Sequence, residues 1–228
     1  MINKVFKKEW ADIISAHYSI EKFSLLGRKI AQLRDHSTVY PDKKEVFKAF
    51  ELTEYQDIKV VLLGQDPYHD GSADGLAFSA SNNSVSCPPS LRLILKELER
   101  TYPDLARDIH FGKLDPQDLS RWAEQGVFLL NTSLTVQKGK PGSHSIYWKN
   151  FTKSVIKAIN NKQDIIWLLM GNEAKQYKPL ITNPSHAIVE TYHPAADVYA
   201  KQDLFYGSGA FKQVNEELEI RNKSKIIW

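Results

Sequence analysis

Residues 58–69 read Ile58-Lys59-Val60-Val61-Leu62-Leu63-Gly64-Gln65-Asp66-Pro67-Tyr68-His69, an apolar run that ends abruptly in polar and aromatic side chains. Five of the first six residues are apolar, mostly β-branched or Leu, which indicates a strand that is buried on both faces. Gly64 and Pro67 prevent the strand from continuing. Residues that can carry chemistry therefore begin where this strand ends.

Three further apolar runs end in the same way. Residues 126–130 lead into Asn131, residues 164–170 lead into Gly171 and Asn172, and residues 186–192 lead into His193. Ligands of open α/β sheets bind at the carboxyl ends of the strands, so the four runs predict one crevice that is assembled from distant parts of the chain. Strand-to-loop turns also favour Asp, Asn, Gly and Pro, so a plain turn stays open for any single run. A carboxylate, an amide and an imidazole that converge favour a functional crevice.

Helical periodicity alternates with these runs. Helices are predicted for residues 5–14, 24–33, 43–50, 119–124, 148–160 and 210–218, and for a segment that begins with Ser90 as its N-cap. The alternation predicts an α/β fold, a three-layer sandwich with a central, mainly parallel four-stranded sheet flanked by helices. A length of 228 residues fits one domain that spans residues 1–228.

Composition limits the cellular setting and the partners. The net charge of +3 does not by itself indicate nucleic-acid binding, but Lys138 and Lys140 are placed to form a basic rim near Asn131. Cys87 is the only cysteine, which excludes an internal disulfide and a cysteine-rich metal site. The sequence shows no secretory signal and no apolar run long enough to span a bilayer, so we expect a cytoplasmic protein without a membrane partner.

An ordered set of motifs resembles the family 1 uracil-DNA glycosylases, and the likeness extends from about residue 40 to the C-terminus. Residues 64–69 are similar to the water-activating motif of that family, and residues 129–136 are similar to its base-reading strand end. The other similar segments are Gly75-Leu76-Ala77-Phe78-Ser79, Pro88-Pro89-Ser90-Leu91, Ser143-His144, His193-Pro194 and Ile226-Ile227-Trp228.

The resemblance implies a monofunctional uracil-DNA glycosylase, which hydrolyses the N-glycosidic bond of uracil in DNA and leaves an abasic site that starts base-excision repair. It implies uracil-containing single- and double-stranded DNA as the substrate, and a proteinaceous DNA-mimic inhibitor as a candidate partner of a monomeric enzyme. It implies no metal and no other cofactor, because hydrogen-bond donors alone can stabilise the uracil anion that leaves.

The role that the resemblance implies for each residue fits the chemistry of its side chain. Asp66 would orient and deprotonate water, and His193 would donate a hydrogen bond to uracil O2. Asn131 would donate to O4 and accept from N3–H, while Phe78 would stack on the base. Tyr68 would block the methyl group of thymine, since an apolar pocket alone discriminates poorly against one methyl.

The resemblance also implies contacts around this centre. Gln65 would contact uracil through its backbone amide. The implied DNA contacts come from His69, Pro88, Pro89, Ser90, Ser143, His144, Gly171, Asn172, Ala195, Val198 and Tyr199. Ser-His-Asp catalysis by Ser143, His144 and Asp66 is a conceivable alternative, but no Gly-x-Ser-x-Gly elbow precedes a helix in this chain.

The chain departs from the family after His193-Pro194. It continues with residues 195–199, Ala-Ala-Asp-Val-Tyr, where the family has Ser-Pro-Leu, so a phosphate-binding hydroxyl is lost and Asp197 stands where Leu enters the duplex. A carboxylate in a base stack would face desolvation and phosphate repulsion, so we expect Val198 or Tyr199 to act as the wedge.

The departures leave one alternative function open. The chain would then be a weakly active or inactive DNA-binding scaffold, or a polymerase processivity partner, that has kept the fold. Asp66, Asn131 and His193 argue against this alternative, because a scaffold has no need of all three.

Overall fold

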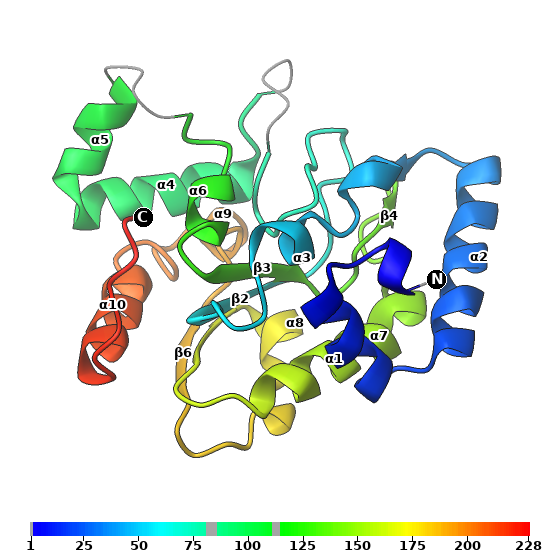
Figure 1. Ribbon diagram of the computed structural model, residues 1–228. Helices are drawn as coiled ribbons and strands as arrows, with labels where there is room; N and C mark the ends of the chain where they lie inside the picture. Colours follow the sequence, from blue (N-terminus) through cyan, green and yellow to red (C-terminus); the bar gives the residue numbers. More distant parts are fainter. Residues whose placement is uncertain (1, 81–85, 111–114) are drawn as a thin grey trace.

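The centre of the molecule is a four-stranded parallel sheet (Figure 1). The computed structural model describes residues 2–80, 86–110 and 115–228. The strand order is β3-β2-β5-β6, with β2 at Val60–Gly64, β3 at Val127–Asn131, β5 at Ile166–Met170 and β6 at Ala187–Thr191. Every residue of β2, β3 and β5 is buried, as continuous apolar runs require in a sheet that is covered on both faces. The predicted fold class is confirmed.

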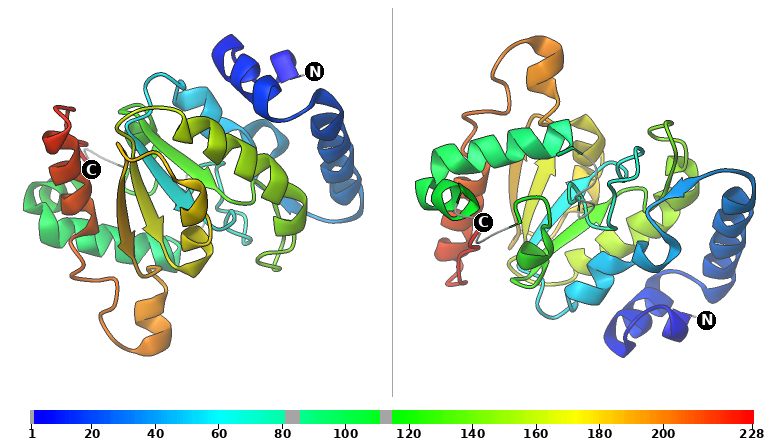
Figure 2. Two further views of the ribbon diagram at one scale, coloured as in Figure 1. Left: turned by 90° about the horizontal axis from the view of Figure 1, so that it is seen from below. Right: turned by 90° about the horizontal axis from the view of Figure 1, so that it is seen from above.

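Helices form the two outer layers. Figure 2 shows α7 (Ser145–Asn160) in front of the sheet in the view from below and α4 (Pro89–Thr101) in front in the view from above. α10 (Ala210–Ile220) contacts β5 and β6. The other helices are α1 (Lys8–His17), α2 (Ile20–His36), α3 (Lys48–Leu52), α5 (Pro103–His110), α6 (Ser120–Ala123), α8 (Asn172–Lys175) and α9 (Ala196–Ala200), with short 3₁₀ turns η1 (Ile2–Lys4), η2 (Lys43–Glu45) and η3 (Lys178–Leu180). A small antiparallel pair joins β1 (Val39–Tyr40) to β4 (Val136–Gln137).

Each predicted helix overlaps an observed one, but several boundaries differ. The predicted N-cap Ser90 is wrong: α4 begins at Pro89, with Pro88 in the N-cap position. A proline at the first helical position is favourable, because it lacks the N–H that would have no partner there. The segment predicted as one helix at residues 43–50 is divided into η2 and α3.

The sheet register places the strand ends that carry the candidate site side by side. Gly64 at the end of β2 pairs with Asn131 at the end of β3. Met170 at the end of β5 pairs with Thr191 at the end of β6, and the Gly171 N–H donates to the Thr191 carbonyl at 3.0 Å. The residues that follow these strands therefore emerge along one edge of the sheet.

Aromatic packing fixes the layers on either side of the sheet. Trp10 of α1 stacks on Phe128 of β3 with ring centroids 5.1 Å apart. Trp228 lies edge-on against Trp122 at 5.1 Å and donates through Nε1 to the Phe211 carbonyl. Among the described residues, no helix combines the length and the apolar composition that crossing a bilayer requires.

Candidate active site

A cavity of about 310 Å³ opens at the carboxyl edge of the sheet. It brings together four residues that the sequence places in one crevice, since Asp66, Phe78, Asn131 and His193 all line it. The other lining residues are Gly64, Gln65, Pro67, Tyr68, His69, Leu76, Ser90, Pro141, Ala195 and Tyr199. The side chains come from four separate parts of the chain, which the parallel strands bring to one edge.

Asn131 is the last residue of β3, and its side chain is only 3% exposed. Its carboxamide has no hydrogen-bond partner among the described residues, and Asn131 lines the cavity. Gly64 on the neighbouring strand makes room for it: a Cβ atom at position 64 would lie 2.4 Å from Asn131 Oδ1 and 3.4 Å from the Phe78 ring. The glycine at this strand end was missed as a site residue, although the sequence shows it directly before the polar motif.

Asp66 is held by the backbone of a second loop. Its Oδ2 accepts a hydrogen bond from the Gly142 N–H at 2.5 Å. Burial raises the pKa of Asp66 above its usual value, and the Gly142 N–H acts against this shift because it stabilises the carboxylate. Gly142 has a φ of 75°, which favours glycine at this position. Sequence reasoning missed Gly142, because a backbone donor leaves no signal in residue type.

His193 is neutral at pH 7, with its proton on a defined nitrogen. Burial lowers its pKa below the ordinary value for histidine. The Ala195 N–H donates to Nδ1 at 3.1 Å, so Nδ1 is an acceptor and the single proton of the neutral ring lies on Nε2. The ring packs above Gly171, where an added Cβ would lie 2.7 Å from the His193 Cβ. His193 therefore offers the site a neutral Nε2–H donor.

Phe78 has a strained backbone, with a φ of 63°. Its carbonyl accepts from the Tyr68 hydroxyl at 3.1 Å, and the buried Asp74 accepts from Ser79 Oγ at 2.7 Å and from the Leu76 N–H at 3.1 Å. The Phe78 ring lies 5.7 Å from the His193 ring, at an interplanar angle of 40°. Strain of this kind persists where the surroundings fix it and is concentrated at functional sites.

The residues predicted to contact DNA occupy different environments. His69, Pro89, Asn172, Val198 and Tyr199 are exposed, and Ser90, Ser143 and Ala195 are half-buried. Of these, His69, Ser90, Ala195 and Tyr199 line the cavity. Pro88 and Gly171 are buried. These two residues therefore differ from the rest of the set in having little exposed surface.

His144 is not brought to that surface. It is 2% exposed, and its Nδ1 is hydrogen-bonded to Thr135 Oγ1, which also accepts from Trp148 Nε1. Ser143 Oγ accepts from the Gln137 N–H at 3.0 Å. These contacts build the loop that carries Gly142, and no hydrogen bond among the described residues joins Ser143, His144 and Asp66 as a Ser-His-Asp relay would.

The Asp197 side chain is held by a neighbouring backbone segment. Its carboxylate accepts hydrogen bonds from the backbone N–H groups of Leu204, Phe205 and Tyr206. Val198 and Tyr199, the expected wedge candidates, are 59% and 86% exposed. Only Tyr199 of the two lines the cavity.

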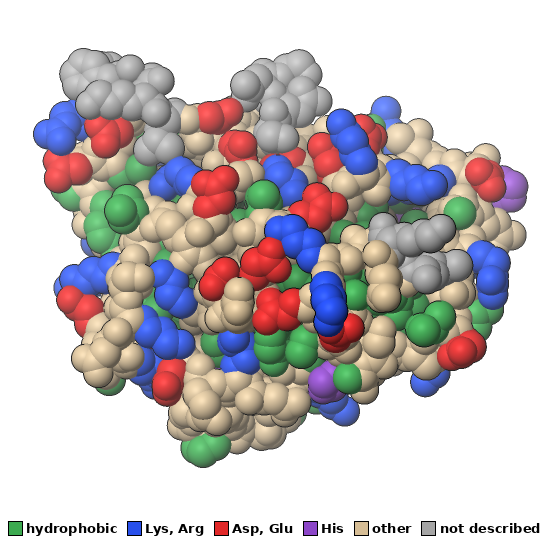
Figure 3. All heavy atoms as spheres, in the orientation of Figure 1, with side chains coloured by type: hydrophobic (Ala, Val, Ile, Leu, Met, Phe, Trp, Pro, Cys, Tyr) green, Lys and Arg blue, Asp and Glu red, His purple; other side chains and the backbone are tan. Residues whose placement is uncertain are grey.

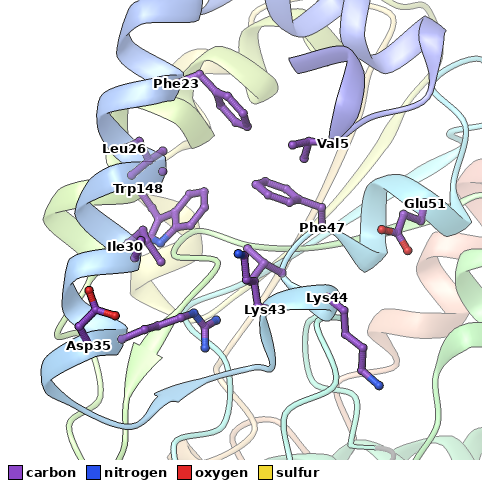
Figure 4. A pocket seen from close by; sticks show the side chains of 14 residues that line it. Val5, Phe23, Leu26, Ile30, Asp35, Lys43, Lys44, Phe47, Glu51 and Trp148 are labelled. Carbon is purple, nitrogen blue, oxygen red and sulfur yellow. The ribbon is translucent and has the colours of Figure 1, made fainter. Parts of the chain in front are cut away.

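A second hollow, of about 540 Å³, lies between α2, the η2–α3 segment and α7 (Figure 4). Its walls include Phe23, Leu26, Ile30, Phe47 and Trp148, with charged side chains beside them. None of the predicted site residues lines it. Within the described ranges, no group of three His, Cys, Asp or Glu side chains is arranged to hold a metal ion.

Comparisons with known proteins agree on one family. The sequence profile described as the Uracil DNA glycosylase superfamily matches residues 50–219. A protein named uracil-DNA glycosylase from Aliarcobacter butzleri is 41% identical over 223 residues, which cover 96% of this chain and 99% of the relative. One from Borrelia turicatae is 44% identical over 227 residues, covering 96% of each chain.

Solved structures agree with this result. The crystal structure of mimivirus UNG Y322L in complex with UGI has a TM-score of 0.83 to this chain at 25% identity, and covers 100% of this chain and 90% of the other. The UNG structure from Nitratifractor salsuginis has a TM-score of 0.64 at 18% identity and shares the fold. From its matching profile and its relatives, this chain belongs to the uracil DNA glycosylase superfamily.

Proposed function

We propose that this chain is an active, monofunctional uracil-DNA glycosylase of family 1, which hydrolyses the N-glycosidic bond of uracil in DNA and leaves an abasic site for base-excision repair. The observation that carries the proposal is the meeting of Asp66, Phe78, Asn131 and His193 around one cavity. The same four residues give the cavity a carboxylate, a stacking ring, a base-reading amide and a neutral donor. A DNA-binding scaffold would need none of this arrangement.

Recognition requires the nucleotide to rotate out of the duplex, because the glycosidic bond cannot be reached inside the stack. Phe78 stacks on the extruded base, and the unpartnered Asn131 amide donates to O4 and accepts from N3–H. Tyr68 lines the same cavity and opposes a methyl group at C5 with the edge of its ring. The backbone of Gln65 is at the cavity wall, in reach of the base.

The chemistry uses water and protein groups. Ionised Asp66 orients the water and accepts its proton as the water oxygen forms a bond to C1′. The bond between C1′ and N1 breaks, and its electron pair leaves with uracil. The neutral Nε2–H of His193 donates to O2, where this negative charge accumulates, and the carboxylate of Asp66 stabilises the positive sugar.

The DNA is held by the rim of the cavity. Exposed and half-buried residues at or near the mouth, among them His69, Pro89, Ser90 and Asn172, contact the backbone, and Lys138 and Lys140 add positive charge. Tyr199 enters the space that the base leaves, because it is both highly exposed and part of the cavity mouth. α9, which carries Tyr199, projects from the body of the molecule in both views of Figure 2.

The rim of the cavity also determines which partners the chain binds. We propose single- and double-stranded DNA as substrates and an inhibitor protein that mimics DNA as a ligand of the groove, a proposal that the UGI complex of the mimivirus protein supports. We further propose that the chain acts as a monomeric single domain inside the cell, where its DNA substrate lies.

The test is abasic-site formation on a uracil-containing oligonucleotide. The purified chain is incubated with the oligonucleotide and EDTA, and the products are cleaved with alkali and separated on a gel. We expect release of free uracil and strand cleavage at the uracil position, with no effect on the matching thymine oligonucleotide. Absence of turnover on both single- and double-stranded substrates, with DNA binding retained, would leave only the scaffold function.

A further inference from the structure

Asp197 connects α9 to a segment that lies seven to nine residues further along the chain. Its Oδ1 accepts from the N–H groups of Leu204 and Phe205 at 2.8 and 2.6 Å, and its Oδ2 accepts from the N–H of Tyr206 at 2.9 Å. Hydrogen bonds to an ionised acceptor are stronger than those between neutral groups. The carboxylate thus ties the first turn of α9 to residues 204–206.

Residues 205–209 are themselves fixed to α4. Phe205 is fully buried, and the Tyr206 ring lies under Lys96 with Nζ 4.4 Å from its centroid. Glu97, which is 0% exposed, accepts from the N–H groups of Gly207 and Gly209 at 2.7 and 2.9 Å. Asp197 is therefore bonded to a segment that the helical layer anchors.

α9 has little else to hold it in place. It is five residues long, and none of its side chains is buried. Helices this short are not stable in water on their own, so tertiary contacts must fix them. At its start, the Ala196 N–H donates to the His193 carbonyl at 2.8 Å, which holds one end of the segment only.

We propose that Asp197 is a positioning residue for duplex opening: its carboxylate fixes α9 to the anchored segment and so holds Tyr199 at the mouth of the cavity. The inference rests on the proposed function and on the wedge role of Tyr199. It gives a physical role to the acidic residue that replaces the family's apolar wedge. The carboxylate stays out of the base stack and orders the neighbouring segment that carries the aromatic ring.

The inference predicts a defect that depends on the substrate. A wedge is needed only where a base must be separated from its stacked and paired neighbours, so single-stranded DNA does not require it. A general loss of folding would lower activity on both substrates equally. The ratio of kcat/KM on duplex to kcat/KM on single-stranded uracil DNA therefore separates positioning from stability.

The experiment measures this ratio for the full chain and for Asp197→Ala, Asp197→Asn, Tyr199→Ala and the double variant Asp197→Ala/Tyr199→Ala. Asp203→Ala is the matched control, since Asp203 is an exposed acid of the same loop that accepts no hydrogen bond from the described residues. We expect Asp197→Ala to lower the ratio by about tenfold, which corresponds to loss of about 1.4 kcal/mol of transition-state stabilisation. Single-stranded activity and the Asp203→Ala ratio should stay within about twofold of the unmodified chain, less than the effect of one lost hydrogen bond.

The double variant tests whether Asp197 acts through Tyr199. If it does, the double variant should have the same ratio as Tyr199→Ala, because the two effects then share one element and are not additive. Asp197→Asn should give a smaller loss, since its amide retains one oxygen acceptor, and it decides the matter if Asp197→Ala does not fold.

Two results would overturn the inference: an unchanged ratio in the Asp197 variants, or equal losses on both substrates in every Asp197 variant that folds. Failure of the proposed function has a different signature, because the unmodified chain would then release no uracil even from single-stranded DNA.

Discussion

At the scale of single residues, burial shifts the pKa values of Asp66 and His193 in opposite directions, and both shifts bear on the proposed reaction. Burial raises the pKa of Asp66 and lowers the pKa of His193. The proposed reaction needs the ionised carboxylate and the neutral imidazole. Each of these forms predominates at pH values above the pKa of its group. Activity should therefore rise as the pH increases through the pKa values of His193 and Asp66, and should then level off.

Asp66→Asn tests the proposed role of Asp66 as the catalytic carboxylate. Turnover should fall by about 100-fold or more, because a positioned general base contributes roughly 10²–10⁴-fold. DNA binding should persist, since the amide can still accept from the Gly142 N–H. Single-turnover kinetics and a binding titration with the same duplex measure the two effects, and full activity in the variant would remove Asp66 from the mechanism.

The same substitution has a pH-dependent effect on stability. The folded-state pKa of Asp66 lies above the unfolded value, so the ionised carboxylate destabilises the fold at pH values above the folded pKa. Asp66→Asn should therefore raise the melting temperature at pH 7. The difference should shrink as the pH falls through the raised pKa and vanish below the unfolded pKa. Thermal unfolding from pH 3 to 8 measures this difference. A gain in melting temperature that grows as the pH falls would contradict a raised pKa of Asp66.

Tyr68→Ala tests exclusion of thymine. Without the ring, a C5 methyl group should fit, and the variant should release thymine from a thymine-containing oligonucleotide at a detectable rate. Tyr68→Phe is the control: it keeps the ring but loses the hydrogen bond to the Phe78 carbonyl, so it should still reject thymine. Chromatography of the released bases distinguishes the two variants, and no thymine release by Tyr68→Ala would argue against a steric role.

The meeting of Asp66, Asn131 and His193 at one cavity was predictable from sequence, while the groups that hold these side chains in place were not. Asp66, Asn131 and His193 follow apolar runs, which marks them in the sequence. The Gly142 N–H carries no such mark, because every residue except proline has one. The burial of His144 depends on Thr135 and Trp148, which pack around it only in the folded chain.

At the scale of elements, the close approach of β2, β3 and the Phe78 segment forms the pocket wall. Gly64→Ala should place a Cβ 2.4 Å from Asn131 Oδ1 and 3.0 Å from the Ala77 Cβ, so side chains or backbone must move. We expect a loss of about 1–3 kcal/mol in unfolding free energy, as for other overpacked sites, together with loss of uracil release.

Gly27→Ala is the control for Gly64→Ala. It lies in α2 with no atom within 4 Å of the added Cβ, so it should stabilise the helix by up to about 1 kcal/mol. Urea unfolding followed by circular dichroism measures both variants. Equal stability and activity of Gly64→Ala and the unmodified chain would show that this wall is not tightly packed.

Length alone does not decide which elements could be predicted: α6, with four residues, lies within a predicted helix, whereas α5, with eight residues, was not predicted. β2, β3 and β5 are fully buried and give continuous apolar runs, from which they were located. β6 is only partly buried and contains Glu190, but its apolar start was enough to locate it. α8 and α9 have four and five residues, too few to show a helical period, and tertiary contacts rather than propensity hold them. The hydrogen bonds of Asp197 join residues that are seven to nine positions apart in the chain, and no sequence pattern predicts them.

At the scale of the whole molecule, charge is distributed rather than concentrated. The net charge is only +3, and Figure 3 shows acidic and basic side chains interspersed over the face that it presents. Affinity for DNA must then depend on a few local cations near the cavity. Lys138 and Lys140, both exposed on the loop before Gly142, are the candidates.

Lys138→Ala and Lys140→Ala should each weaken binding to DNA and reduce its salt dependence. Each phosphate contact that is lost should lower the slope of log K against log salt by about 0.9 for duplex DNA. Lys157→Ala, an exposed lysine on α7 that does not line the active-site cavity, should leave the slope unchanged. Fluorescence anisotropy over a salt series measures the slopes. If the slopes of all three variants equal that of the unmodified chain, a basic rim at this loop is excluded.

A crystal structure of Asp66→Asn bound to a uracil-containing duplex would show directly whether the cavity holds an extruded uracil. We expect uracil in the cavity, with Phe78 on its face, Asn131 on its O4 and N3 edge, His193 Nε2 near O2, and Tyr199 in the space that the base has left. A base that remains stacked in the duplex, or that binds in the hollow between α2 and α7, would contradict this expectation.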